Sequence, residues 1–195
     1  MMPLRLVATL LVLAPAGAFA AAADAPPARI LKVDRTRSFV DVDVKMTVGS
    51  FVARLERWDA HFTFDDAGKI RTGTFKFKFA DLKTGDPQRD ADMLKWLGGG
   101  DPEGRFLLGV LAAAPDGQGV VNGNLTFHDR TQRIEFPVQF TRAGDTYTLT
   151  GEVTLDYTQW GLKVIRRALV AKVDPEVRVR LKLVGEAVAA PPVIK

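Results

Sequence analysis

The sequence contains no cysteine. This absence excludes disulfide bonds, thiolate metal ligands and a thiol nucleophile, so the hydrophobic core has to stabilise the fold by itself. Apart from its apolar N-terminal segment, the chain has about 170 residues, which suits one domain with a substantial core. We therefore expect a single domain without covalent cross-links.

Histidine and serine are also scarce. His61 and His128 lie far apart and form no His-x-His or His-x-x-x-His pair, so no metal site is expected. Neither Ser38 nor Ser50 has the Gly-x-Ser-x-Gly context of a nucleophile elbow. The glycines at 98–100 follow a predicted helix instead of opening one, unlike a phosphate-binding loop. Catalysis therefore has no positive support, and we predict that the protein is not an enzyme.

Long apolar runs are absent after the first twenty residues. In residues 1–20, Arg5 precedes the apolar run Leu6–Leu13, and Ala18-Phe19-Ala20 fits the small-x-small cleavage pattern. This run is too short for a comfortable membrane span. We predict a signal peptide over 1–20, a flexible leader over 21–28 and a location outside the cytoplasm.

A strong excess of one charge is missing as well. The chain has 27 Lys and Arg against 23 Asp and Glu, and the two signs are interspersed. A nucleic-acid-binding protein would be expected to concentrate its basic residues on one face. We therefore expect no nucleic-acid partner.

What the sequence does have is alternation with a period of two. In Phe39–Met46 apolar residues alternate with charged ones, which is typical of a half-buried strand. The stretch Gly49–Arg57 is less regular and is interpreted as a crossing between strands. Similar alternation or a more continuous apolar run recurs between short turn signals. The stretches are Trp58–Phe64, Phe75–Phe79, Arg105–Ala114, Val120–His128, Ile134–Phe140, Tyr147–Leu155 and Val177–Val184.

One segment has a helical pattern instead. Asp86 suits the N-cap and Pro87 the first helical position. Apolar residues then recur at the spacing of one helix face, and three glycines end the segment. The apolar residues are Met93, Leu94, Trp96 and Leu97. Two interpretations follow: a lid that covers the end or edge of a sheet, and the gate of a hydrophobic cavity.

The order of these elements predicts an all-β fold. About eight or nine strands joined mainly by short turns indicate an antiparallel meander with one inserted helix. A sheet of this many strands tends to curl, and closure removes its exposed edges, so we predict a barrel in preference to a sandwich. The domain is expected to span 29–187, with 188–195 as a loose tail.

Closure would bring complementary charges together. If the first and last strands pair, Arg178, Arg180 and Lys182 form a row beside Asp41 and Asp43. Each exposed cross-strand pair contributes only about 0.2–1 kcal/mol, so these charges help to set the register without driving the fold.

The aromatic content has two interpretations. The chain has 12 Phe and 3 Trp. An eight-stranded barrel is at the size where the interior is either just filled by side chains or holds one small ligand. The rings therefore form either an aromatic-rich core or the walls of a cavity.

Several short motifs, taken in order, are fairly specific. They are Val33-Asp34, Ser38-Phe39-Val40, Gly73, Thr84-Gly85 with Arg89-Asp90 and Leu94, Gly123-Asn124-Leu125-Thr126 with Thr131, and Trp160-Gly161. Their order and spacing resemble those of the YceI-like family of exported bacterial proteins, from about Ile30 to Ala187. The sequence departs from the family pattern at Met46, Tyr157 and Asp129, where His, Arg and Gly are common.

The resemblance implies a lipocalin-like antiparallel β-barrel of about eight strands, with the helix over an elongated apolar cavity. It also implies an exported lipid-binding protein that holds a long isoprenoid chain for carriage or storage. The ligand would be an isoprenoid quinone or a polyprenyl lipid such as a polyprenyl phosphate, with no cofactor required. The expected ligand-binding residues that line the cavity are Met46, Trp58, Phe75, Phe77, Trp96 and Trp160.

Two alternatives stay open at this point. A filled barrel acting as a periplasmic protein-partner or stress-related module would lack a cavity and expose an apolar patch. An enzyme acting on an isoprenoid or another small molecule would need polar groups that converge inside the barrel. A transient contact with a membrane surface is a further expectation. The oligomeric state is left open, with a homodimer among the alternatives.

Overall fold

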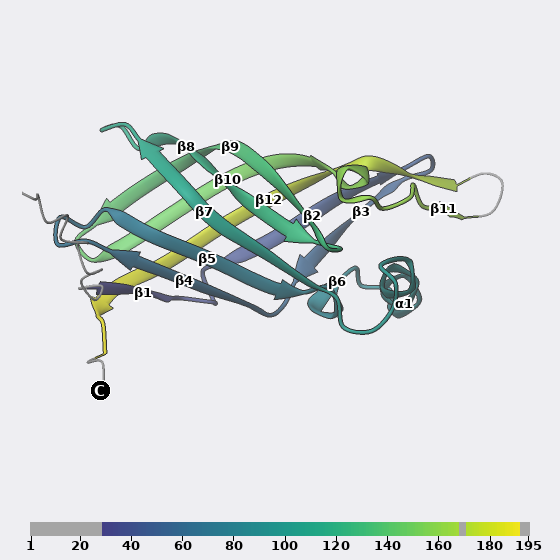
Figure 1. Cartoon of the computed structure of the whole chain (residues 1–195), viewed down its shortest axis with the longest axis horizontal. Helices are drawn as coiled ribbons and strands as arrows, with labels where there is room; N and C mark the ends of the chain where they lie inside the picture. The colour runs from purple at the N-terminus through teal and green to yellow at the C-terminus, as the bar shows by residue number, and fades with distance from the viewer. Residues whose placement is uncertain (1–28, 168–170, 192–195) are drawn as a thin grey trace, which may run out of the picture.

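The computed structural model describes residues 29–167 and 171–191, and its body is a closed eight-stranded antiparallel barrel (Figure 1). The predicted signal peptide and leader lie outside the described residues. The strands are β1 (Arg29–Val33), β2 (Phe39–Met46), β3 (Ser50–Leu55), β4 (Trp58–Phe64), β5 (Ile70–Lys78), β6 (Leu82–Lys83), β7 (Glu103–Ala113), β8 (Gln118–Phe127), β9 (Arg130–Ala143), β10 (Thr146–Asp156), β11 (Arg166–Arg167) and β12 (Ala171–Ala189). The helical segments are η1 (Phe79–Asp81), α1 (Pro87–Trp96) and η2 (Tyr157–Trp160).

The barrel is an up-and-down meander in which the first three strands are interrupted. β1 with β2, β3 with β4, and β5 with β6 each follow one another along the same barrel strand. β7, β8, β9, β10 and β12 complete the circuit, and β11 pairs with the start of β12. β12 pairs with β10 on one side and with β1 and β2 on the other, which closes the sheet. The predicted barrel is therefore confirmed.

The interruption between β1 and β2 is held by local hydrogen bonds. The Asp34 carboxylate accepts from the backbone N–H of Thr36 at 2.9 Å, as in an Asx turn. The Ser38 hydroxyl donates to the Asp34 carbonyl at 2.6 Å and accepts from the backbone N–H of Val184 at 2.9 Å. Ser38 thus ties this turn to β12. The pairing of β1 and β2 with β12 closes the barrel and is called the seam below.

The predicted pairing of the first and last strands is confirmed, together with its charges. Arg178 lies opposite Asp43, and Arg180 lies opposite Asp41. The Arg180 guanidinium donates to both carboxylate oxygens of Asp43 at 2.8 Å, and this interaction lowers the pKa of Asp43. Arg54 on β3 makes the same bidentate contact with the buried Asp41 carboxylate, at 2.8 and 2.9 Å. The seam is a linked set of ion pairs on the outer face.

Helix α1 begins and ends where the sequence indicates. The Asp86 carboxylate accepts from the backbone N–H groups of Gln88 and Arg89, and Pro87 occupies the first turn. At the other end, the Gly99 N–H donates to the Leu94 carbonyl at 2.8 Å, and Gly99 has a φ of 77° that favours glycine. The helix is therefore limited at both ends by local chemistry.

The structure corrects the sequence analysis in three places. The stretch read as a crossing at 49–57 contains strand β3, which pairs with both β2 and β6. β12 continues to Ala189, two residues into the expected tail. Phe79 lies in the 3₁₀ turn η1 and not in a strand, because the chain bends there between β5 and β6. Among the described residues, no helix has the length and apolar character needed to cross a membrane.

Candidate functional site

The barrel encloses an elongated cavity of about 530 Å³. All eight barrel strands contribute inward-facing side chains to its wall, and helix α1 lies beside one end. Many inward-facing apolar side chains, including Phe75, Phe77 and Leu181, are only half-buried because they border this empty space. The alternation of each strand therefore produces an apolar surface that faces inward and is not filled by its neighbours.

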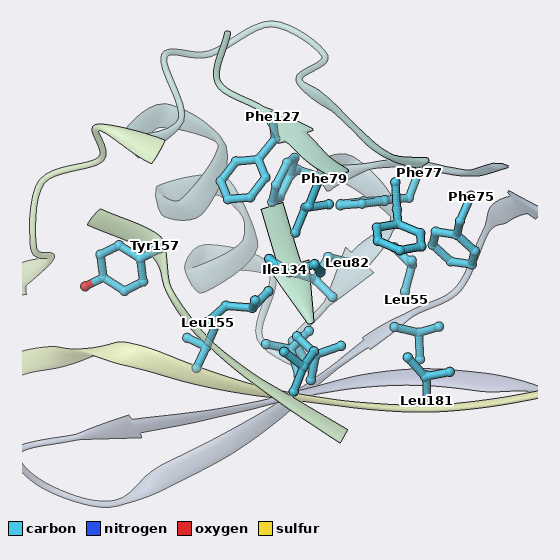
Figure 2. A pocket seen from close by; sticks show the side chains of 18 of the residues that line it. Leu55, Phe75, Phe77, Phe79, Leu82, Phe127, Ile134, Leu155, Tyr157 and Leu181 are labelled. Carbon is cyan, nitrogen blue, oxygen red and sulfur yellow. The ribbon is translucent and has the colours of Figure 1, made fainter. Parts of the chain in front are cut away.

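Aromatic rings form a continuous row along one side of the barrel. Consecutive ring centroids are 5.1, 6.1, 5.2, 5.5 and 4.5 Å apart, in the range of favourable aromatic contacts. The row runs Trp58, Phe75, Phe77, Phe79, Phe127 and Trp160. Figure 2 shows the four phenylalanines side by side, with Leu181 and Leu155 on the opposite side of the pocket. This row gives the cavity a rigid aromatic wall.

One end of the cavity, called the closed end below, is formed by packed rings. Phe64 is fully buried and its ring centroid lies 4.6 Å from that of Tyr147, and the Phe140 ring lies 5.8 Å from the Tyr147 ring. The Tyr147 hydroxyl donates to the Gly68 carbonyl at 3.2 Å, and Arg142 lies over the Tyr147 ring. The closed end is therefore apolar inside and hydrogen-bonded at its outer rim.

The other end, called the mouth below, is bordered by α1 and by the chain that follows β10. The Trp96 indole N–H donates to the Lys163 carbonyl at 2.8 Å, and the Trp96 ring meets Tyr157 edge-on at 5.1 Å. At the start of α1, the Asp90 carboxylate accepts from the Thr84 N–H at 3.0 Å and the Thr84 hydroxyl at 2.6 Å. Two separate tethers thus hold the helix beside the mouth.

Charged side chains occur in the cavity lining at the mouth, where α1 and the β11–β12 pair contribute them. Arg89 and Asp92 come from α1, Arg166 from β11 and Lys172 from β12. Tyr157 also borders this end, and burial raises the pKa of its hydroxyl, so it stays neutral at ordinary pH. Within the described ranges, no three His, Asp or Glu side chains form a group that could hold a metal ion.

The structure places four of the six residues selected from the sequence on the cavity wall. Met46 and Trp96 border it near the mouth, and Phe75 and Phe77 belong to the aromatic row. These side chains come from β2, α1 and β5, so the barrel brings together positions that are far apart in the sequence.

Trp58 and Trp160 do not line the cavity, because other rings cover them. Trp58 stacks on Phe75 at 5.1 Å and is covered from outside by the Arg35 guanidinium at 4.7 Å. Trp160 is 1% exposed, stacks on Phe127 at 4.5 Å and donates its indole N–H to the Leu125 carbonyl at 3.1 Å. Both tryptophans support the wall from the ends of the aromatic row.

Several lining residues were not selected from the sequence. Phe127 and Leu155 follow the strand alternation and could have been found from that signal, whereas Phe79 reaches the wall from the 3₁₀ turn η1. Arg166 and Lys172 carry no such signal, because they lie in a short strand pair that has no clear pattern in the sequence.

Comparison with known proteins agrees with this architecture. A crystal structure of BcnA from Burkholderia cenocepacia matches with a TM-score of 0.65 and 21% identity, covering 78% of this chain and 99% of that one. A polyisoprenoid binding domain from Saccharophagus degradans, implicated in plant cell wall breakdown, matches with a TM-score of 0.60 and 16% identity, covering 83% and 99%. A YceI protein from Campylobacter jejuni matches with a TM-score of 0.51 and 11% identity, covering 72% and 85%. At these identities the likeness shows the fold alone.

The fold and the cavity define a class, a closed lipocalin-like antiparallel barrel around an apolar interior. Residues 31–185 match the protein-family model of the YceI-like domain. The chain therefore belongs to the YceI-like family, as the sequence motifs indicated. No curated protein matches the chain.

Proposed function

We propose that this protein is exported to the periplasm and holds a long isoprenoid chain in its barrel for carriage or storage. The ligand is an isoprenoid quinone or a polyprenyl lipid whose tail occupies the cavity and whose head group stays at the mouth. The observation that carries the proposal is an elongated cavity with an apolar wall, closed by rings at one end and bordered by charged groups at the other.

The dimensions of the cavity favour a long, narrow ligand. Its volume of about 530 Å³ lies within the range of about 300–1,000 Å³ that is common for ligand sites. Along β12 the lining residues run from Lys172 to Leu183, which at about 3.3 Å per residue is roughly 35 Å of strand. With a strand tilt of about 40°, this length is roughly 27 Å along the barrel axis. An extended hydrocarbon chain fits such a shape better than a compact molecule does.

The apolar wall supplies the binding energy without any charge contact. Each methylene-sized group moved from water into the cavity contributes roughly 0.8 kcal/mol. Because the rings are already fixed in the aromatic row, little side-chain ordering opposes this gain. The name of the polyisoprenoid binding domain from Saccharophagus degradans supports the same ligand class for this chain.

The filled-barrel alternative loses its basis, because that alternative required side chains to occupy the interior. The cavity also gives an isoprenoid-modifying enzyme little support. Its charged side chains belong to α1, β11 and β12 near the mouth, and the wall farther inside is lined by hydrocarbon.

Lipid extraction from the purified protein followed by mass spectrometry tests the proposal. We expect an isoprenoid lipid to co-purify in a fixed ratio with the protein. Leu181→Trp places a larger ring inside the barrel beside Gly151, which is its neighbour on β10, and should strongly reduce the lipid content. Lys182→Trp adds a ring of the same size on the outer face of the same strand and is the matched control.

Two results would contradict the proposal. One is a protein that is uniformly empty after expression in a quinone-rich host. The other is equal lipid content in Leu181→Trp and Lys182→Trp, since a tail inside the barrel has to compete with the new ring.

A further inference from the structure

Three glycines on neighbouring strands belong to the inner face of the barrel. They are Gly73 on β5, Gly104 on β7 and Gly123 on β8. Residues directly opposite one another on paired strands share one face of the sheet. Gly73 lies opposite Phe62, which lines the cavity. Gly104 lies opposite Phe77, which also lines it. Gly123 lies opposite the lining residue Leu108. The wall therefore lacks a side chain at three inward positions.

A phenylalanine ring from the neighbouring strand lies on each of these glycines. The pairs are Phe62 on Gly73, Phe77 on Gly104 and Phe106 on Gly123. A Cβ atom added to the glycine would be no more than 2.8 Å from a ring carbon in each pair. Non-bonded carbon atoms prefer separations of about 3.5–4.0 Å. Each ring thus occupies the space that a side chain at the glycine would need, which is the close approach that glycine in a strand permits.

The contact between Phe77 and Gly104 depends on the ring most directly. The three atoms nearest to an added Cβ at Gly104 all belong to the Phe77 ring, whereas at the other two glycines atoms of β7 are also within reach. The Phe77 ring lies between those of Phe75 and Phe79, at centroid distances of 6.1 and 5.2 Å (Figure 2). With a neighbouring ring on two sides and the strand behind it, a displaced Phe77 ring moves into the cavity.

We infer that these glycines set the width of the cavity, and that the Phe77–Gly104 contact is a specificity determinant for a methyl-branched chain. The inference rests on the proposed function, because it concerns the isoprenoid tail. A ring that lies on a glycine extends along the wall and leaves the central space open. Methyl branches make an isoprenoid chain wider than an unbranched chain with the same main chain. A side chain at position 104 should therefore exclude the branched chain first.

Two alcohols with the same main chain test this inference. Phytanol is a saturated isoprenoid alcohol, and hexadecanol lacks its methyl branches. Purified, delipidated protein is titrated with each alcohol, and binding is followed by the fluorescence of the tryptophans, among which Trp96 borders the cavity. The unmodified protein should bind phytanol more tightly, because the branches add buried apolar surface. G104A should lower the affinity for phytanol about fourfold for each branch that the displaced ring excludes. Its affinity for hexadecanol should stay nearly the same.

The matched control is G109A, which adds the same methyl group to the same strand. Gly109 is exposed, and the atom nearest to an added Cβ is the side-chain oxygen of Asn122, which can turn away. This variant should bind both alcohols as the unmodified protein does. An equal loss of phytanol binding in G109A and G104A would overturn the inference, since the effect would not depend on the inner face.

The double variant F77L/G104A shows whether the ring is the group that the new methyl displaces. Leucine is smaller than phenylalanine and makes room at position 104, so the double variant should bind phytanol as F77L does. Such non-additivity identifies a direct contact between the two positions. If G104A alone does not fold, F77L/G104A should recover the melting temperature of F77L. A double variant that is as impaired as G104A overturns the inference.

The remaining outcomes separate the inference from the proposed function. An unmodified protein that binds neither alcohol overturns both. An unmodified protein that prefers hexadecanol to phytanol overturns the inference, because its cavity is then too narrow for the branches. Equal losses for the two alcohols in G104A, or no loss for either, also overturn the inference and leave lipid binding intact.

Discussion

The two ends of the cavity share the same apolar wall but are bounded by different chemistry. At the closed end, Phe64 and Tyr147 are 0% and 3% exposed, and their rings pack directly on one another. At the mouth, a ten-residue helix with no buried residue lies beside Arg89, Arg166 and Lys172. The closed end is filled by buried rings, whereas at the mouth a buried cluster around Trp160 lies beside an exposed helix and charged side chains.

This difference assigns a separate task to each end. Tight ring packing at the closed end stabilises the barrel and sets the depth to which a hydrophobic tail can enter. At the mouth, α1 itself has no buried residue, and its Met93 and Trp96 are only partly buried where they pack against the cluster around Trp160. An exposed element of this kind opens at a lower free-energy cost than a buried core does. We therefore expect a ligand to enter past α1, and we expect mutations of the packed rings at the closed end to affect stability more than mutations of partly buried side chains at the mouth.

The largest effect is expected for Phe64→Ala. Removing a fully buried ring costs about 3–5 kcal/mol in the free energy of unfolding, because the packed neighbours cannot collapse into the space. The same change at Phe51, a half-buried ring at the mouth, should cost roughly half as much or less, because part of this ring already faces the cavity. Urea denaturation of both variants measures the difference. Equal losses at the two sites would break the distinction between the two ends.

A smaller effect is expected for the two tryptophans that donate hydrogen bonds near the mouth. Trp160→Phe leaves the buried Leu125 carbonyl without its donor and should cost about 1–3 kcal/mol. Trp96→Phe removes the bond to the Lys163 carbonyl, which water can replace, and should cost at most about 1 kcal/mol.

Amide hydrogen exchange provides a second measurement on the Trp96→Phe and Trp160→Phe variants. Trp96→Phe should accelerate exchange of the Leu97 and Gly98 amides, which bond within the end of α1, because it releases one tether of the helix. Trp160→Phe should leave these amides unchanged. If neither variant alters exchange in α1, the Trp96 contact does not restrain the helix.

The smallest effect is expected for the stability that two ion pairs lose at acidic pH. At the closed end, Arg29 donates to the Asp145 carboxylate at 2.6 Å and lowers the pKa of Asp145, as Arg180 does for Asp43 at the seam. A carboxyl with a lowered folded-state pKa contributes stability above its ordinary value of 3.8 and loses it as pH falls through the lowered value. Because Asp145 is exposed, its contribution is small.

Thermal unfolding between pH 7 and pH 2 measures this dependence. The melting temperature of Asp145→Asn should fall slightly less on acidification than that of the unmodified protein, and Asp43→Asn should behave in the same way. Identical pH profiles for all three proteins would contradict the assignment of these ion pairs.

Local patterns in the sequence were sufficient for most of the fold. The alternation in β2, β4, β9 and β12 and the capping residues of α1 depend on neighbours within a few positions, so they can be read without the tertiary structure. The acidic residues of β2 and the basic residues of β12 also predicted that these two strands pair at the seam, because opposite charges on neighbouring strands favour pairing. β3 was missed because its exposed Val52 is apolar, so Phe51, Val52 and Ala53 form an apolar run in the sequence although their burial alternates.

The candidate site could be predicted only in part. Met46, Phe75, Phe77 and Trp96 were placed on the wall because inward positions follow from strand and helix periodicity. The same periodicity cannot show that Phe75 covers Trp58 or that Phe127 covers Trp160, since each contact joins different strands or segments.

The sequence by itself determined which residues face inward, where the helix begins and ends, and which strands carry complementary charge. These features arise from local periodicity and from charges that act over short distances. Only the tertiary structure decided that the inward rings leave an open cavity and that Arg166 and Lys172 meet at its mouth. The reason is geometric, because the space between side chains depends on how eight strands tilt and pack together, and no single stretch of sequence contains that arrangement.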